Sequence, residues 1–592
     1  MTRSLFLCIF RIMLKEYKTL VPYLKKYLIY YIAGIFCLVI TDAGLLYIPQ
    51  FIKKAINSVS VGAFELSLIG RYMIQMVMLA ILISIGRFFW RFFIHGASRR
   101  IETELREKIF YHLLDMSSAF YGEHKTGDIM ARMTNDMKAI RMASGMAFVA
   151  FIDGLFMALA ILVILFTSYS RLTLITIIPL PFITIIVLFA GKMLGKRFKR
   201  VQEAYSAISE RVQESFSGIS VIKTFTQEEH FLNEFGRDND EYWAANMSLI
   251  RIWGFIFPVV SFLSGITVCL LLLYGGSQLM MNQLNPGNFV AVMSYLAMLI
   301  WPMLGAGFTV NLIQRGGASL KRINQILEVE PEISNGESPR DVPIFKELTV
   351  NSLNYTFHGS GDSVINDLTL TLRAGETLGI LGKTGSGKTT FIRLLPRILE
   401  SEEGQIHYNG IPLHSLELSS LRSSIAMVPQ ETILFSRSIR ENILYSKEDA
   451  SEEELARVVH ISTLDRDLKN FPDGMETQVG ERGVSLSGGQ KQRIAFARAL
   501  LADPELLILD DALSAVDTKT EEFILKELVK LRKGKTNIII SHRVSTLQVS
   551  NKILVLRKGS IGQYGSHKEL SRQDGLYKRI FDLQSMEQEE QS

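Results

Sequence analysis

Apolar residues are distributed unevenly along this chain, and their distribution divides it into two parts. Long apolar runs dominate residues 27–315, whereas the remainder alternates short apolar strands with helices of ordinary polarity. A helix needs about 20 apolar residues to cross the hydrocarbon core of a bilayer. Six runs approach this length, near residues 27–50, 69–94, 145–168, 172–193, 252–276 and 287–313. The pattern therefore predicts an all-α transmembrane domain of six long helices.

Basic residues flank some of these runs much more than others. They are frequent before the first run, after the second and after the fourth, whereas the loops at 169–171 and 277–286 hold only Arg171. Lys and Arg accumulate on the cytoplasmic side of membrane proteins. We therefore expect both termini and two long loops to be cytoplasmic, although Lys53 and Lys54 run against the trend. This topology accounts for the net charge of +5, and no basic stripe with interleaved aromatics indicates nucleic-acid binding.

The two long cytoplasmic loops, near residues 95–144 and 194–251, are rich in Arg, Lys, Glu, Ala and Leu. They predict helices that continue the spans, and about twenty helical residues extend roughly 30 Å. A turn near residues 121–127 would then press on a soluble domain. Loops of this length between spans favour such a mechanical lever over a pair of solvated hairpins.

Several residues inside the predicted spans are unusual for a membrane helix. Asp42 and Asp153 are ionisable, so each is expected to contact a cationic substrate or to hydrogen-bond a neighbouring helix. The prolines expected to kink these helices are Pro179, Pro181, Pro258 and Pro302. The three cysteines, Cys8, Cys37 and Cys269, have no spacing typical of a metal site or a disulfide framework.

A phosphate-binding loop is visible at residues 382–389, which read Gly-Lys-Thr-Gly-Ser-Gly-Lys-Thr. It follows an apolar strand at 377–381 and precedes a helix at 390–395, the context that such a loop requires. Its glycines let backbone N–H groups approach phosphate oxygens, its lysine adds positive charge, and its threonine hydroxyl is a ligand for Mg²⁺. The expected nucleotide-binding residues are Gly382, Lys383, Thr384, Gly385, Ser386, Gly387, Lys388, Thr389 and Thr390.

Two further polar residues follow apolar strands in the same part of the chain. Asp510 ends the run Leu-Leu-Ile-Leu, which is typical of a buried parallel strand, and is expected to hold the Mg²⁺ shell. His542 follows a second run of this kind at 537–541. Ligands bind at the carboxyl ends of strands in open α/β sheets, so His542 is a candidate site residue.

With the motif Leu-Ser-Gly-Gly-Gln at 486–490, these features make the chain similar to half-transporters of the ATP-binding cassette (ABC) exporter type. The resemblance covers nearly the whole sequence, and residues 126–136 and 214–228 resemble the family's two intracellular loops. It implies six spans in the plasma membrane followed by an α/β P-loop ATPase cassette with a helical subdomain. It also implies ATP and Mg²⁺ as cofactors and a dimer in which two cassettes sandwich ATP.

The resemblance also implies roles for individual residues of the cassette. Gln430 joins the Mg²⁺ shell and senses the membrane domain, His542 contacts the γ-phosphate, and residues 513–517 cross the dimer. Phe357 stacks on adenine, with Tyr355 as the neighbouring candidate. Residues 477–483 contact the coupling loops. Within the signature at 485–490, the residues that touch the partner's nucleotide are Ser487, Gly488, Gly489 and Gln490.

The chain departs from the family at Asp511, where a glutamate normally polarises the attacking water. Loss of one methylene withdraws the carboxylate by roughly 1.5 Å, about one C–C bond. A misplacement of about 1 Å can lower a rate ~100-fold, and general-base help contributes about 10²–10⁴-fold. Because Lys388, Thr389 and Asp510 are unchanged, the site is expected to bind ATP and to hydrolyse it slowly. This favours a heterodimer whose other chain carries the glutamate over a homodimer with two slow sites.

The sequence thus predicts ATP-driven export of amphipathic or hydrophobic compounds, drugs or lipids, by alternating access. The expected partners are a second half-transporter, membrane lipid and a small amphipathic substrate, without nucleic acid. An ATP-gated channel or a regulatory ABC protein is the alternative class. The expected segments are an N-terminal interfacial segment 1–26, a transmembrane domain 27–320, a linker 321–344, a nucleotide-binding domain 345–585 and a polar tail 586–592.

Overall fold

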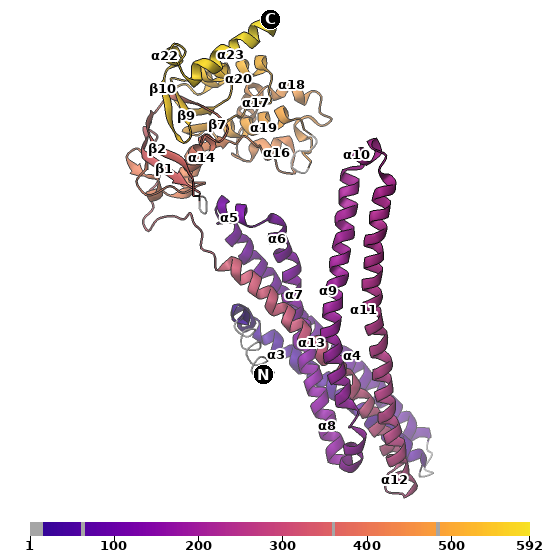
Figure 1. Ribbon diagram of the computed structural model, residues 1–592. Coiled ribbons are helices and arrows are strands. Elements are labelled where there is room, and N and C mark those ends of the chain that lie inside the picture. The colour runs from indigo at the N-terminus through magenta and orange to yellow at the C-terminus, as the bar shows by residue number, and fades with distance from the viewer. Residues whose placement is uncertain (1–15, 61–65, 358–360, 481–485, 592) are drawn as a thin grey trace. The chain divides into compact units, whose positions relative to one another are not determined.

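The chain divides into two compact units in a computed structural model that describes residues 16–60, 66–357, 361–480 and 486–591 (Figure 1). The first unit comprises the residues up to Leu114 together with Lys125–Val329. The second comprises Asp115–His124 and the residues from Glu330 onward. The short segment Asp115–His124 thus interrupts the first unit in sequence and belongs to the second in space.

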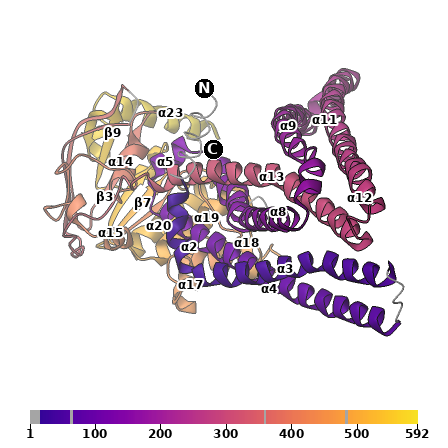
Figure 2. The same cartoon turned by 90° about the horizontal axis from the view of Figure 1, so that it is seen from below.

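Helices alone make up the described part of the first unit. Their bounds are η1 Tyr17–Leu20, α2 Val21–Lys26, α3 Leu28–Ser60, α4 Leu66–Leu114, α6 Thr126–Ala131, η2 Arg132–Asp136, α7 Met137–Met142, η3 Ala143–Ala147, α8 Phe148–Thr176, α9 Leu180–Ser217, α10 Ile219–Thr224, α11 Glu228–Leu270, η4 Leu271–Gly275, α12 Gly276–Met280 and α13 Pro286–Leu327. The elements α6 to α8 follow one another directly, as do α11 to α12, but α8 is kinked at Tyr169, whose φ and ψ of −146° and 45° are not helical. Figure 2 shows α3 beside α4 and α9 beside α11.

Among the described residues, five helical segments are long and apolar enough to cross a membrane. They are Leu28–Ser60, Ser67–Leu114, Thr126–Thr176, Glu228–Met280 and Pro286–Leu327. The remaining long helix, α9, does not meet this measure, because its apolar start is soon followed by Lys192, Lys196 and Arg197.

The fourth predicted span, 172–193, is divided between two helices, and its continuity was wrongly predicted. Helix α8 ends at Thr176 and α9 begins at Leu180, with a turn between them. Pro179 caps α9 and Pro181 lies in its first turn, where the missing N–H of proline costs no helical hydrogen bond. These two prolines therefore begin a helix instead of kinking one. Pro258 and Pro302 do lie inside helices, as predicted, and Pro49 lies inside α3.

The two long loops between the spans are helical, as predicted. Helix α4 continues to Leu114, and α9 and α11 enclose the short helix α10 at the tip of a hairpin (Figure 1). Helix α13 continues to Leu327, through the first part of the segment 321–344.

The second unit combines strands with helices. Its elements are α5 Ser118–Glu123, β1 Glu347–Thr356, β2 Ser363–Arg373, β3 Thr377–Gly382, α14 Lys388–Leu394, β4 Ile406–Tyr408, β5 Ile411–Pro412, η5 Leu413–Ser415, α15 Leu418–Ser424, β6 Ile425–Val428, α16 Ile439–Leu444, α17 Glu452–Ile461, α18 Leu464–Leu468, η6 Gly474–Glu476, α19 Gly488–Leu501, β7 Leu506–Asp510, α20 Thr518–Leu531, β8 Thr536–Ile540, α21 Val544–Leu547, β9 Lys552–Arg557, β10 Ser560–Gly565, α22 His567–Leu570 and α23 Leu576–Gln591. Helices α16 to α19 lie between β6 and β7 in sequence and form the predicted helical subdomain.

A six-stranded sheet with the order β10-β9-β3-β8-β7-β6 forms the centre of this unit. Its strands pair in parallel except for β10, which is antiparallel to β9. Successive residues of β7 point into two different cores: Leu507 and Leu509 into one, and Leu506 and Ile508 into the other. Burial on both faces explains why these strands are continuous apolar runs. The carboxyl ends of β3, β6, β7 and β8 consequently meet at one edge of the sheet.

Candidate functional site

The loop between β3 and α14 has a backbone that requires glycine at defined positions. Gly385 and Gly387 have φ angles of +79° and +96°, which residues with a side chain rarely adopt. A Cβ atom on Gly382 would lie 2.7 Å from the carbonyl oxygen of Leu556, and one on Gly387 would lie 2.9 Å from that of Val364. Because these glycines carry no Cβ atom, the chain can form a tight loop in which backbone N–H groups come close together.

Lys388 is buried at the base of this loop. Its Nζ donates hydrogen bonds to the carbonyl oxygens of Gly382 at 2.7 Å and Lys383 at 3.1 Å. Desolvation lowers the pKa of Lys388, and the nearby carboxylates of Asp510 and Asp511 oppose this shift. The hydroxyl of Ser386 is buried and has no hydrogen-bond partner among the described residues. The loop thus concentrates one ammonium group and one unsatisfied hydroxyl where an anion with several oxygen atoms would fit.

Thr389 and Asp510 join the loop to the end of β7. The Thr389 hydroxyl donates a hydrogen bond of 2.9 Å to Oδ2 of Asp510, whose residue is only 2% exposed. Burial raises the pKa of Asp510, and the hydrogen bond from Thr389 opposes that rise. Hydroxyl and carboxylate oxygens are the ligand types that Mg²⁺ takes. This donor pair therefore fits a magnesium ion bound with phosphate.

Three predicted site residues follow neighbouring strands at the same edge of the sheet. Asp511 directly follows β7, Gln430 lies two residues after β6, and His542 lies two residues after β8. The side chains of Gln430 and His542 are exposed, and that of Asp511 is half-buried. Asp511 has a φ angle of +49°, a left-handed conformation that aspartate tolerates better than most residues. The sheet thus brings these residues to the edge where Asp510 ends its strand.

The signature motif begins a different helix, α19. Ser487 caps this helix: its Oγ accepts from the N–H of Gln490 at 3.3 Å, and its own N–H donates to Gln490 Oε1 at 2.9 Å. A Cβ atom on Gly489 would lie 2.7 Å from the carbonyl oxygen of Ala515, so glycine is needed there. Ser487 and Gly488 are exposed. Ser485 and residues 481–484 lie outside the described residues.

Comparisons with known proteins match both units of this arrangement. The ABC transporter transmembrane region matches residues 31–303, and the ABC transporter domain matches residues 365–514. A probable multidrug resistance ABC transporter ATP-binding/permease protein, YheI of Bacillus subtilis, is 38% identical over 95% of this chain and 97% of its own length. The chain belongs to the ABC transporter family.

Other relatives agree with this assignment. The multidrug resistance-like ATP-binding protein MdlA of Escherichia coli is 36% identical over 94% of each chain. An ATP-dependent lipid A-core flippase of Desulfotalea psychrophila is 30% identical over 96% of this chain and 98% of its own. A bacterial Atm1-family ABC exporter with ATP bound shares the fold, with a TM-score of 0.80 over 95% of this chain and 99% of that chain at 24% identity.

Family membership confirms several predictions from the sequence. The chain is a multi-pass membrane protein with an ATP-binding domain, and this ABC ATPase is coupled to transport. The predicted fold class, a long helical membrane domain followed by an α/β cassette, is confirmed.

One tip of the membrane helices packs within the cassette unit of this ABC transporter. The segment Asp115–His124 contains α5 and overlaps the predicted turn at 121–127. The Ser118 hydroxyl donates to the carbonyl oxygen of Ile398 at 3.3 Å, and the Ser117 hydroxyl donates to a Glu332 carboxylate oxygen at 2.8 Å. These contacts favour the lever interpretation over a free hairpin. Of residues 477–483, only the first four are described, and there the N–H of Val479 donates to the carbonyl oxygen of Arg437 at 2.9 Å.

The two candidate adenine-stacking rings differ in exposure. Tyr355 and Phe357 form an edge-to-face pair with ring centroids 5.1 Å apart. Tyr355 packs against the core beneath β1, and this burial raises its pKa. Phe357 is 41% exposed. The more exposed of the two rings is therefore that of Phe357, the residue placed there by the family resemblance.

The two aspartates of the membrane helices lie together. Asp42 of α3 is buried, and it lies close enough to Asp153 in α8 for the two carboxyl groups to interact electrostatically. Arg87 of α4 lies close enough to act electrostatically on both. This proximity joins two neighbouring helices, and both alternatives drawn from the sequence stay predictions.

Sequence reasoning missed Gln492 on α19. Its Nε2 donates to the carbonyl oxygen of Asp511 at 3.4 Å and to the Ser514 hydroxyl at 3.1 Å. Its Oε1 accepts from the N–H of Ala515 at 2.9 Å. Gln492 therefore holds the chain just after Asp511. A polar residue on a helix gives no sequence signal of such contacts, because its partners follow only after the next strand.

Proposed function

We propose that this chain is one half of a paired ABC exporter that moves amphipathic or hydrophobic compounds, drugs or lipids, out of the cell membrane. The names of its relatives, which refer to multidrug resistance and to a lipid A-core flippase, support this substrate class. We propose further that the two ATP sites of the pair are unequal, and that the site built on this chain's phosphate loop is the slower one.

Asp511 carries this proposal. Its backbone is held on both sides: its N–H donates to the carbonyl oxygen of Ile540 at 3.0 Å, and its own carbonyl oxygen accepts from the Ser514 hydroxyl at 2.8 Å. The backbone therefore cannot advance to compensate for a side chain that is one methylene shorter than glutamate. The carboxylate stays withdrawn by roughly 1.5 Å from the position of a glutamate carboxylate. Misplacement by about 1 Å lowers catalytic rates ~100-fold.

Nucleotide binding does not depend on that carboxylate. Lys388 supplies the charge for the β- and γ-phosphates, and Thr389 with Asp510 would hold Mg²⁺, which when bound neutralises phosphate charge. Phe357 offers the exposed ring for adenine, while Gln430 and His542 complete the edge around the γ-phosphate. These residues support tight binding at a site that turns over slowly.

Pairing is supported by two exposed surfaces of the chain. Ser487 and Gly488 expose the signature, which in a head-to-tail sandwich completes the nucleotide site of a second cassette. At the tip of the α9–α11 hairpin, Phe216, Val221 and Phe225 are exposed apolar side chains around α10. Another polypeptide that covers these side chains would remove them from water.

The proposed cycle follows from these positions. ATP binding closes two cassettes against each other, and the closure draws the intracellular helices together. The spans then change from an inward-open to an outward-open arrangement, and hydrolysis, mainly at the other site, resets the pair. A homodimer with two slow sites and an ATP-gated channel or regulatory protein are the competing possibilities.

The test compares Asp511→Glu with wild type, each purified alone and with the second half-transporter. Glutamate should raise hydrolysis at this site by about 10–100-fold, since it restores a displacement of the order that costs ~100-fold. The Kd for ATP should stay within about twofold, because the binding residues are untouched. The neutral variant Asp511→Asn is the matched control and should not raise the rate of ATP hydrolysis. An unchanged rate in Asp511→Glu contradicts the slow-site assignment, and brisk hydrolysis by the wild-type chain alone contradicts the unequal pair.

A further inference from the structure

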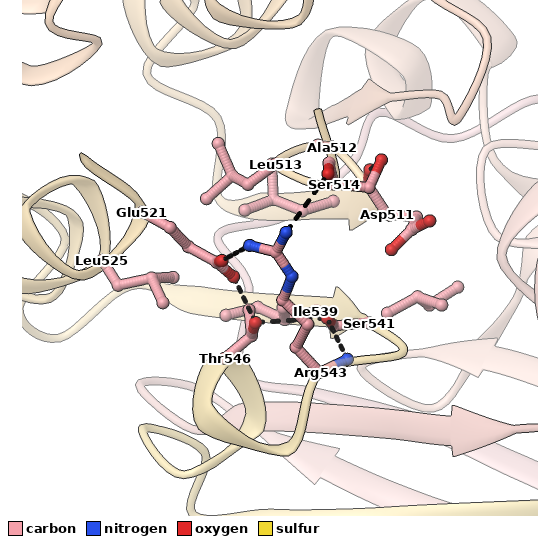
Figure 3. A pocket seen from close by; sticks show the side chains of 12 residues that line it. Asp511, Ala512, Leu513, Ser514, Glu521, Leu525, Ile539, Ser541, Arg543 and Thr546 are labelled. Atoms are coloured by element: carbon pink, nitrogen blue, oxygen red, sulfur yellow. Dashed lines mark hydrogen bonds and ion pairs between the residues drawn. The ribbon is translucent and has the colours of Figure 1, made fainter. Parts of the chain in front are cut away.

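An ion pair between a buried acid and a half-buried base lines the same pocket as Asp511 and is not used by the proposed cycle (Figure 3). Its acid is Glu521 on α20, a residue only 4% exposed, and its base is Arg543, which immediately follows His542. Charged side chains are rarely buried unless a specific arrangement holds them. Because the pair lies next to the proposed ATP site, its contacts identify which segments of that site it holds in place.

Arg543 connects the segment of His542 to the loop that follows β7. Its guanidinium pairs with the Glu521 carboxylate through Nη1, which also donates to the carbonyl oxygen of Val516 at 3.2 Å. Its Nη2 donates to the carbonyl oxygen of Ser514 at 3.4 Å. Figure 3 shows the guanidinium between Glu521 and this loop. The planar fork of arginine makes several such contacts at once, which a lysine cannot do.

Glu521 holds the same segment through a second contact. Its other carboxylate oxygen accepts a hydrogen bond from the Thr546 hydroxyl. The Ser541 hydroxyl donates to Thr546 Oγ1 at 3.2 Å and accepts from the N–H of Arg543 at 3.0 Å. The residues on both sides of His542 are therefore tied to Glu521.

The C-terminal helix holds the His542 segment from another side. Gln584 of α23 donates from Nε2 to the carbonyl oxygen of His542 at 2.9 Å and accepts at Oε1 from the N–H of Val544 at 2.8 Å. With its backbone held at these points, His542 cannot shift without also moving Arg543.

The loop held by Arg543 is also in contact with the signature helix. Between Ser514 and Val516 lies Ala515, whose carbonyl oxygen abuts Gly489 and whose N–H donates to Gln492 at 2.9 Å. A displacement of residues 512–517 would therefore reach the signature. In the proposed pair, that signature completes the other chain's nucleotide site.

We propose that Glu521 and Arg543 are positioning residues that transmit the state of His542 to residues 512–517 and to the signature, and so link the two ATP sites. This inference rests on the proposed pairing of two cassettes. Contact of His542 with a γ-phosphate moves its segment, Arg543 carries the movement to the carbonyl groups of Ser514 and Val516, and Gly489 is repositioned. The slow site on this chain thereby regulates hydrolysis at the other one.

Arg543→Lys is the sharpest test, because it keeps the charge but cannot reach Glu521 and both carbonyl groups together. The full-length chain and its second half-transporter are purified together in lipid nanodiscs. Nucleotide trapped by vanadate is then detected on each chain by photolabelling with 8-azido-ATP. The variant should lose about tenfold in trapping on the other chain and in kcat. Its KM for ATP and the labelling of its own site without vanadate should change less than twofold.

Two further variants separate positioning from folding. Lys530→Gln breaks an ion pair with Glu527 on the same helix, but that pair is solvent-exposed, so trapping and kcat should stay at wild-type values. Glu521→Gln combined with Arg543→Gln removes both charges and leaves neither carboxylate nor guanidinium buried alone. If Arg543→Lys lowers the Tm, the double variant distinguishes a positioning role from a folding role. We expect it to keep the wild-type Tm and still to lose nucleotide trapping on the other chain.

The outcomes distinguish this inference from the proposed function. Failure of the wild-type pair to trap nucleotide on the other chain overturns the pairing of unequal sites, whatever the variants do. Wild-type trapping with unchanged trapping and kcat in Arg543→Lys and in the double variant overturns the link. A parallel rise in KM and fall in own-site labelling would show that the pair merely maintains the fold of the phosphate-loop side, and would also overturn it.

Discussion

The phosphate-loop side and the signature side of the cassette differ in how far each is completed by its own chain. On the phosphate-loop side, Lys388 and Thr389 bond within the chain to Gly382 and Asp510, and Lys388 is buried while Thr389 is half-buried. On the signature side, Ser487 and Gly488 are exposed, and the hydrogen bonds of Ser487 serve only to begin α19. The difference teaches that one chain pre-organises its phosphate loop by itself, whereas its signature stays exposed, as the proposed pairing with a second cassette requires.

The largest effect is expected from a substitution on the phosphate-loop side. Lys388→Ala removes the buried ammonium group that we propose to contact the phosphates, and loss of one preorganised donor costs about 10²–10³-fold in rate. Hydrolysis at this site should fall by that factor, and binding of a fluorescent ATP analogue to this chain should weaken. Lys568→Ala, an exposed lysine on α22, is the control and should behave as wild type. Retained binding and hydrolysis in Lys388→Ala would show that the loop is not the nucleotide site.

The next largest effect is expected from a substitution that alters only the signature side. Gly489→Ala places a Cβ atom 2.7 Å from the carbonyl oxygen of Ala515, so the loop after β7 must move. Nucleotide trapped on the other chain should fall at least about tenfold, because shifts near 1 Å cost ~100-fold. Gly488→Ala is the matched comparison, since its Cβ would make an ordinary contact of 3.6 Å with Ala515, and its effect should be smaller. Equal effects of the two variants would argue against this steric explanation.

A smaller effect is expected at the hydrogen-bonded pair of Thr389 and Asp510, where Asp510 ends β7. Thr389→Val removes the hydroxyl that bonds Asp510, and hydrogen bonds to charged groups contribute about 1.5–3 kcal/mol. The Mg²⁺ concentration for half-maximal hydrolysis should rise about tenfold, which corresponds to about 1.4 kcal/mol. Thr389→Ser keeps the hydroxyl and should need nearly the wild-type concentration. A titration with Mg²⁺ at saturating ATP makes the measurement, and identical curves for all three proteins would remove Thr389 from the metal site.

The smallest effect concerns the support of the His542 segment. His567 of α22 lies with its Nδ1 2.7 Å from the hydroxyl of Tyr577 on α23, the helix that carries Gln584, and desolvation lowers the pKa of His567. The folded state thus prefers the neutral ring, so the unfolded chain binds more protons as the pH falls through the ordinary histidine value of about 6.5. The contribution of His567 to stability is complete above that pH and declines below it. The Tm should therefore drop slightly from pH 8 to 5.5, and His567→Gln should show a weaker dependence.

The residues of the cassette also differ in whether their roles could be predicted from the sequence. Residues 382–389 have a local pattern that dictates a glycine loop between strand and helix, because the contacts that define it lie within a few residues. Asp510 was recognisable for the same reason, at the end of an apolar strand buried on both faces. By contrast, Glu521 and Gln492 resemble ordinary polar positions on helices, since their partners come from distant segments.

The membrane part shows the same distinction. Hydropathy located the long helices, because crossing hydrocarbon needs a length of apolar sequence. It did not reveal the interruption of the fourth one, because residues 172–191 are largely apolar on both sides of the turn after which Pro179 and Pro181 begin α9. The packing of Asp115–His124 within the cassette unit, and the meeting of Asp42 with Asp153, depend on how helices pack side by side.

For this chain, local patterns in the amino acids were enough to establish the phosphate loop, the signature, the apolar helices and the unusual aspartate at position 511. Folding alone brought Arg543 against the carbonyl groups of Ser514 and Val516, held the backbone of Asp511 in place and set Gly489 against Ala515. The physical reason is that short motifs encode their own backbone geometry, whereas contacts between distant segments exist only once the sheet and its helices have packed.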